Sequence, residues 1–178
     1  MRHILSLMAL FMVLSFCPLG GIYDITLKTI DGDKMELSQF RGKKLLFIVL
    51  PSRSEDPGIS LSQLGQLHAK YQNSLVIIGI PLMEGDFNLG QTVNHREFNE
   101  AIPHMVITES MKAKKGSDQA ELFQWLTSKE KNGHFDEDVS GVGNKFFVDE
   151  QGELYAVMKS NLNLSNSLMD KILSKKEE

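Results

Sequence analysis

The chain has 178 residues, a suitable length for one compact domain with a short terminal extension. Its 19 lysine and arginine residues against 23 aspartate and glutamate residues give a net charge of −4. That balance argues against a nucleic-acid-binding protein, which usually has a basic face. Hydrophobic residues make up 42% of the chain, so a sizeable core can form. The single cysteine, Cys17, excludes an internal disulfide and a Cys-x-x-Cys pair.

The first twenty residues differ in composition from the rest. Arg2 and His3 precede an apolar run over 4–16, and small residues follow. This order is typical of a secretory signal, and the run is shorter than the roughly 20 residues that a transmembrane helix needs. A buried N-terminal helix is the alternative interpretation. We therefore expect 1–20 to be a signal peptide or a lipoprotein signal.

Cys17 adds a second possibility at this end of the chain. The residues before it are similar to a bacterial lipoprotein cleavage box, although Phe16 is larger than the residue usual at that position. Lipidation of Cys17 would anchor the protein to a membrane, whereas ordinary cleavage would remove it. Either process implies an exported protein that is periplasmic, secreted or anchored to the envelope, with its domain over 21–178.

The first half of that domain predicts a hairpin, a buried strand and a helix. The hairpin has strands over 23–30 and 35–37 around the turn Asp31-Gly32. Six apolar residues in succession over 45–50 predict a central strand that is buried on both faces. Apolar residues then recur at helical spacing over 61–71.

The second half continues the alternation of strands and helices. Its expected elements are a buried strand over 75–80, a short helix over 92–100, a strand over 105–108, a helix over 120–126, a surface loop over 129–143, a hairpin with strands over 145–148 and 154–158, and a closing helix over 164–173. Trp125 is expected in the core, and Leu168 and Ile172 are expected on the buried face of the last helix. The pattern predicts an α/β domain, a central mixed sheet with helices on both faces.

Specific motifs at this point carry a family resemblance. The chain resembles the glutathione peroxidases, a family with the thioredoxin-like fold, over roughly 22–174. The motifs are Tyr23-Asp24, Leu37-Ser38-Gln39-Phe40-Arg41-Gly42-Lys43, Gly79-Ile80-Pro81, Ala120 to Leu126, and Lys145-Phe146-Phe147-Val148-Asp149-Glu150-Gln151-Gly152. Their order and spacing together are more specific than any one of them.

The resemblance also implies where an active site should lie, and the residues there differ from the family's. Ser54 stands at the position of the peroxidatic cysteine or selenocysteine, and Glu84 is the nearest match to the active-site glutamine. Gly141 and Val142 stand where the family has tryptophan and asparagine. The resemblance therefore implies a degenerate catalytic site and a vestigial pocket, lined by Ser52, Arg53, Ser54, Glu84, Gly141 and Val142.

These differences predict the loss of thiol peroxidase activity. Peroxide reduction needs a nucleophile that is anionic near neutral pH, and a serine hydroxyl is not ionised without a dedicated base. Glu55 and Asp56 follow Ser54 and would raise the pKa of a thiol placed there. An engineered Ser54 is the alternative, but the changes at the glutamine, tryptophan and asparagine positions argue against it.

The sequence indicates neither a metal site nor a cofactor. No two histidines stand four residues apart, and the acidic run Asp136-Glu137-Asp138 lacks the spacing and central glycine of an EF-hand. Gly141-Val142-Gly143 is not followed by the glycine and helix of a dinucleotide-binding fingerprint.

Three functional hypotheses remain from the sequence. The first is an exported pseudoenzyme, a glutathione-peroxidase-like domain that binds an unidentified protein or small molecule. The second is a divergent oxidoreductase of the same family, linked to oxidative stress, that uses a borrowed thiol or an unrecognised group. The third is a lipid-anchored structural protein that uses Cys17 only as its anchor.

Overall fold

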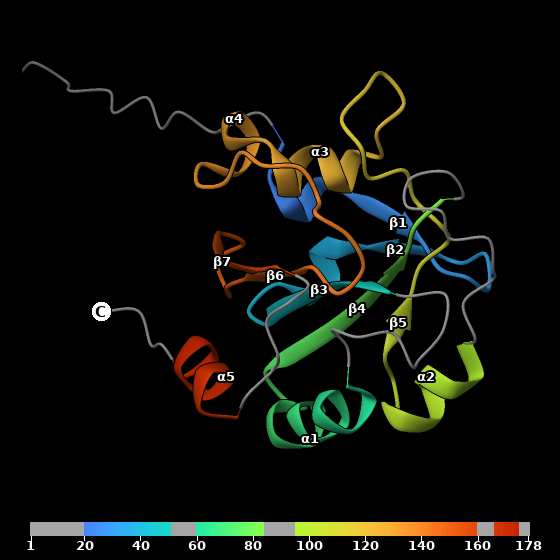
Figure 1. The fold of residues 1–178 in the computed structure, drawn as a ribbon, viewed down its shortest axis with the longest axis vertical. Helices are drawn as coiled ribbons and strands as arrows, with labels where there is room; N and C mark the ends of the chain where they lie inside the picture. Colours follow the sequence, from blue (N-terminus) through green and yellow to red (C-terminus); the bar gives the residue numbers. More distant parts are fainter. Residues whose placement is uncertain (1–19, 51–59, 84–94, 160–165, 175–178) are drawn as a thin grey trace, which may run out of the picture.

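The structure is a computed structural model that describes residues 20–50, 60–83, 95–159 and 166–174. Within these ranges the chain forms one five-stranded sheet, a separate two-stranded hairpin and helices around them (Figure 1). None of the described helices is both long enough and apolar enough to cross a membrane.

The central sheet is mixed, as the sequence predicts. Its strand order is β5-β4-β3-β6-β7, in which β3, β4 and β5 are parallel and β6 and β7 run antiparallel to their neighbours. The strands are β3 (Lys44–Leu50), β4 (Leu75–Pro81), β5 (Val106–Ile107), β6 (Lys145–Val148) and β7 (Leu154–Met158).

The two continuous apolar runs form adjacent strands in the middle of this sheet. All seven residues of β3 are buried, because β4 and β6 flank the strand and other elements cover both of its faces. The prediction of a central buried strand over 45–50 is therefore confirmed.

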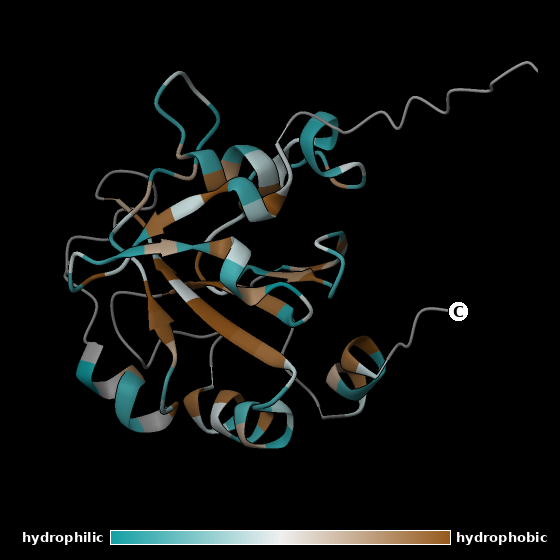
Figure 2. Cartoon of the chain, turned by 180° about the vertical axis from the view of Figure 1, so that it is seen from behind, coloured by the Kyte–Doolittle hydropathy of each residue, from teal (hydrophilic) through white to brown (hydrophobic). Residues whose placement is uncertain are grey.

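Helices cover both faces of the sheet, which confirms the predicted fold class (Figure 1). One face packs against α1 (Leu61–Tyr71), α2 (His95–Ala101) and α5 (Asn166–Leu173). The other packs against α3 (Glu121–Thr127), the hairpin of β1 (Thr26–Lys28) and β2 (Lys34–Glu36), and the 3-10 turns Ile22–Asp24 and Leu37–Phe40. Helix α4 (Lys129–Asn132) follows α3 and packs against it. Figure 2 shows the hydrophobic colouring of the strands between these layers. Trp125 is buried in the second layer, as expected.

Two segments differ from the sequence prediction because polar side chains organise them. The strand expected from Tyr23 begins with a 3-10 turn, in which the Asp24 carboxylate accepts a hydrogen bond from the Gly21 amide at 2.9 Å. The loop expected over 129–143 begins with the one-turn helix α4. Its last residue, Asn132, is buried and donates from its side-chain amide to the carbonyls of Trp125 and Phe135.

The closing helix is also rotated relative to the prediction. Met169 and Leu173 are its buried residues, whereas Leu168 is 37% exposed and Ile172 is only partly buried. The Asp170 carboxylate accepts hydrogen bonds from Lys70 Nζ and Tyr71 Oη of α1. These bonds fix which of two adjacent apolar pairs faces the sheet.

Ion pairs hold the acidic segment 136–138 against its neighbours. Lys115 Nζ lies 3.2 Å from Asp136 and 3.8 Å from Asp138, and Lys159 Nζ lies 2.8 Å from Glu137. Among the described residues, no group of three or more histidine, cysteine, aspartate or glutamate side chains is arranged to hold a metal ion.

Candidate functional site

The carboxyl ends of β3 and β4 meet the loop over 140–144 at one edge of the sheet. Leu50 and Pro81 are paired in register as the last residues of the two parallel strands. The Gly143 amide donates to the Val49 carbonyl at 2.8 Å, and the Val49 amide donates to the Asn144 carbonyl at 2.9 Å. The three segments that carry the predicted pocket therefore leave or join the sheet side by side.

Only part of that pocket can be placed. Gly141 and Val142 are half-buried in the loop at this edge. The remaining predicted residues lie outside the described ranges: Ser52, Arg53, Ser54 and Glu84. The proximity of Ser54 to Glu84 therefore stays a prediction.

Hydrogen bonds inside the loop use most of its main-chain donors. The Asn144 side-chain oxygen accepts from the Ser140 amide at 3.1 Å, the Ser140 hydroxyl at 2.8 Å and the Gly141 amide at 3.0 Å. Gly141 and Gly143 have φ values of 147° and 83°, a region that favours glycine. The loop is thus a closed turn around the buried Asn144 side chain, and those amides are directed inward.

Lys145 is a buried cation directly beneath this loop. Its side chain is fully buried, and its Nζ donates to the Gly143 carbonyl at 2.7 Å. Burial lowers the pKa of Lys145 to about 8 from 10.5, because desolvation disfavours the ammonium form. Sequence reasoning used Lys145 only as part of a motif. The missed signal was that the first strand of the last hairpin pairs with β3 and so becomes a central strand.

The other end of β3 brings together three of the motifs that carry the family resemblance, those over 23–24, 37–43 and 145–152. Tyr23 Oη donates to the Glu150 carbonyl at 3.1 Å, and the Arg41 guanidinium lies 4.4 Å from the centre of the Tyr23 ring. The Gly42 amide also donates to Glu150, at 3.3 Å. Burial, followed by the Asp149 charge, raises the pKa of Tyr23. The tyrosine is therefore a neutral structural hydrogen-bond donor.

The turn over 149–153 is shaped to receive that tyrosine. The Asp149 carboxylate accepts from the amides of Gln151 and Glu153, at 3.0 and 2.8 Å. Gly152 has a φ of 93°, and a Cβ atom there would lie 2.6 Å from Cε2 of Tyr23. The motif residues at this end thus serve packing and turn geometry.

Lys44, the first residue of β3, connects the same end to α5. Its Nζ donates to the Leu173 carbonyl at 2.8 Å and lies 3.8 Å from the Glu150 carboxylate. The same amine lies 5.7 Å from the centre of the Tyr155 ring. Among the described residues the buried Tyr155 hydroxyl has no hydrogen-bond partner, and burial raises the pKa of this phenol.

Comparison with known proteins identifies relatives over most of the chain. It is 28% identical over 158 residues to a "Probable phospholipid hydroperoxide glutathione peroxidase" of Citrus sinensis, which covers 83% of this chain and 92% of the relative. It is 26% identical over 162 residues to "Probable glutathione peroxidase 3, mitochondrial" of Arabidopsis thaliana, covering 86% and 77%. No family model matches the chain.

Solved structures show the same fold. T. cruzi GPX1 superposes with a TM-score of 0.62 at 18% identity, covering 87% of this chain and 95% of the other. A thioredoxin family thiol:disulfide interchange protein from Chlorobium tepidum TLS superposes with a TM-score of 0.57 at 17% identity, covering 86% and 93%. The chain is similar to glutathione peroxidases over most of its length and has the thioredoxin-like fold.

Proposed function

We propose that this protein is a glutathione-peroxidase-like binding domain without thiol peroxidase activity. The observation that carries the proposal is the cysteine count. Cys17 is the single cysteine of the chain, and it precedes the whole segment that forms the thioredoxin-like domain. A thiol-based peroxidase of this fold needs a thiolate at the carboxyl end of β3, and no cysteine follows that strand in the sequence.

Serine cannot replace this thiolate in peroxide chemistry. Attack on a peroxide oxygen requires a polarisable anion, and the product on cysteine is a sulfenic acid that a second thiol reduces. A serine oxygen has no comparable oxidised state, and its hydroxyl is not ionised near neutral pH.

The described part of the site supports the same proposal. Gly141 has no side chain and Val142 has an apolar one, so neither offers a side-chain donor for a developing anion. The amides of Ser140, Gly141 and Gly143 are occupied by Asn144 and Val49. Stabilising an anion requires hydrogen-bond donors directed at it, and these amides already donate to groups within the fold.

The proposal extends to location. The basic start and the apolar run over 4–16 support export, with removal of the segment or lipidation of Cys17 as its two outcomes. In either case the thiol of Cys17 is not available as a nucleophile in the mature domain. The partner that the domain binds is an unidentified protein or small molecule.

Peroxide turnover tests the loss of activity. The full chain and its Cys17→Ser variant are incubated with hydrogen peroxide or a lipid hydroperoxide, with glutathione or thioredoxin as the reductant. We expect peroxide consumption by both proteins to equal that of the buffer. Consumption by the Cys17→Ser variant that persists through repurification would overturn the proposal and favour the divergent oxidoreductase. Native mass spectrometry of the same samples tests binding, and an extra mass that is lost on denaturation is the expected result.

A further inference from the structure

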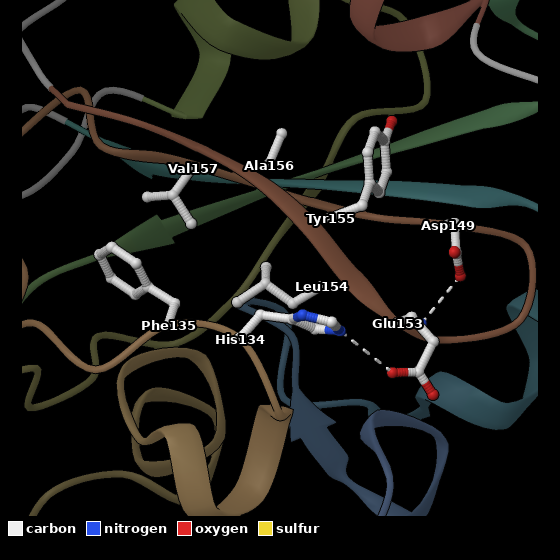
Figure 3. Close-up of a pocket in the computed structure, with 8 residues that line it drawn as sticks. All are labelled: His134, Phe135, Asp149, Glu153, Leu154, Tyr155, Ala156 and Val157. Carbon is white, nitrogen blue, oxygen red and sulfur yellow. Dashed lines mark hydrogen bonds and ion pairs between the residues drawn. The ribbon is translucent and has the colours of Figure 1, made fainter.

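Strand β7 forms one edge of the described sheet, and a groove lies beside it. Among the described strands, β7 pairs only with β6. A groove of about 580 Å³ follows the strand, and Figure 3 shows its lining. The lining residues are His134, Phe135, Asp149, Glu153, Leu154, Tyr155, Ala156 and Val157.

The groove has an apolar middle. Leu154 and Val157 point to the side on which Phe135 lies, and the Phe135 ring is held by an edge-on contact with Phe146 at 6.2 Å (Figure 3). The strand itself, Leu-Tyr-Ala-Val-Met, contains neither a charge nor a proline, the residues that usually protect exposed sheet edges. Its middle residues remain only partly buried.

Opposite charges flank this apolar strand. Glu153 precedes β7 and lies 3.8 Å from His134, and Lys159 follows β7 and lies 2.8 Å from Glu137. All four side chains are more than half exposed, so these pairs are weak and remain open to further charges. An extended partner that fits the edge therefore has an apolar centre, with a basic residue at one end and an acidic residue at the other.

A second copy of β7, running antiparallel, has this chemistry. Its Lys159 comes to the end where Glu153 of the first copy lies, and its Glu153 comes to the end where Lys159 lies. We propose that the β7 edge is a homodimer interface, in which two copies pair their β7 strands across a two-fold axis. Isologous contacts of this kind form closed dimers.

The geometry of β7 restricts how two copies can align. The β6–β7 register skips Tyr155, because Phe147 pairs with Ala156 and Val148 pairs with Leu154. Such a bulge bends the strand and increases its local twist, so few residues of β7 can pair with a second copy. The short pairing of five-residue strands places the interface in the small, weak class, so dimerisation should depend on protein concentration.

Charge reversal gives a direct test by analytical ultracentrifugation. Wild-type protein should form a dimer at high concentration and low ionic strength. Glu153→Lys places lysines at both ends of the strand, and Lys159→Glu places glutamates at both ends. Each variant alone should dimerise about tenfold more weakly or worse, because like charges then meet across the axis.

Mixing the two variants makes the test specific. In an equimolar mixture of Glu153→Lys and Lys159→Glu, each lysine of one copy lies opposite a glutamate of the other. A heterodimer should therefore form over the same concentration range as the wild-type dimer. The matched control is Glu109→Lys, which breaks the exposed Lys28–Glu109 pair near β1 and should dimerise like wild type. A wild-type protein that is monomeric at all concentrations would overturn the proposal. So would a dimer that the single reversals leave unchanged, or a mixture in which dimerisation is not restored.

Discussion

The two ends of strand β3 differ in what their residues do. At the amino end, Tyr23, Arg41 and the turn over 149–153 form a packed, hydrogen-bonded cluster. At the carboxyl end, the loop over 140–144 is closed around the Asn144 side chain. Gly141 has no side chain and Val142 has an apolar one, so neither supplies a side-chain hydrogen-bond donor. Three of the motifs that resemble the peroxidases, those over 23–24, 37–43 and 145–152, meet at the first end, whereas Gly141 and Val142 of the predicted site lie at the second.

This difference explains how a chain can match peroxidases over most of its length while the chemical positions of its predicted site differ. The cluster at the amino end specifies a turn, a tyrosine hydrogen bond and the start of a central strand, all of which are features of the fold. Residues that activate a nucleophile contribute little to these features. Fold and chemistry are therefore carried by separate residues, and each can be tested separately.

The largest expected effect is at the amino end, where Gly152 meets Tyr23. Gly152→Ala should lower the free energy of unfolding by about 2–4 kcal/mol, because the new Cβ atom meets Tyr23 and the residue needs a positive φ. Urea denaturation measures the change.

Gly32→Ala is the matched control for that substitution. Gly32 has a φ of 89°, similar to that of Gly152, but nothing lies within 4 Å of the position that a Cβ atom would take there. This variant should lose only about 1–2 kcal/mol, the cost of the backbone conformation. Equal losses in the two variants would show that Tyr23 packing against Gly152 contributes nothing to stability.

The next effect concerns Lys145 beneath the loop at the carboxyl end. Its pKa is about 8 in the folded protein and 10.5 as the ordinary value, so between these pH values the unfolded chain binds more protons. Stability should therefore rise with pH through this window. Lys145→Met should remove the rise, and the free energy difference between wild type and variant should change by roughly 2 kcal/mol from pH 7 to pH 9.5.

Urea denaturation at both pH values measures this difference. Lys129→Met on α4 serves as the control, because that side chain is exposed and its amine stays in water. A Lys145→Met difference that is independent of pH would contradict the assignment of a desolvated amine beneath the loop.

The smallest effect is at Tyr155, near Lys44 at the amino end. Its buried hydroxyl has no hydrogen-bond partner in the described part of the chain, a state that costs roughly 1 kcal/mol or more. Tyr155→Phe should therefore raise the unfolding midpoint slightly while leaving the fold unchanged. Thermal denaturation checks the direction, and a destabilised variant would mean that the hydroxyl has a partner in solution.

The sequence predicted most of the fold because the core strands are long apolar runs. The runs over 45–50 and 75–80 became β3 and β4, paired side by side. The predictions were wrong in segments where the spacing of apolar residues does not determine the structure. Helix α4 contains no apolar residue, and its buried residue is Asn132. In α5 two adjacent pairs of apolar residues could face the sheet, and the hydrogen bonds to Asp170 determine which pair does.

The candidate site was predictable only as far as the family alignment reaches. Gly141 and Val142 lie beside the end of β3, and their proximity to Ser54 and Glu84 stays a prediction. The roles of Asn144 and Lys145 were not predictable, because each depends on pairing between the last hairpin and β3. Residue type alone suggests an exposed lysine, and only the central position of β6 makes it buried.

The central claim is that the carboxyl end has lost the environment that activates a nucleophile, and not the nucleophile alone. Titrating the thiol of a Cys17→Ser, Ser54→Cys protein against pH tests it most directly, with stopped-flow oxidation by hydrogen peroxide as the second readout. We predict a thiol pKa at or above that of free cysteine, about 8.5, and oxidation at the rate of a small thiol. A thiol pKa below about 7, with oxidation orders of magnitude faster than free cysteine, would contradict the account.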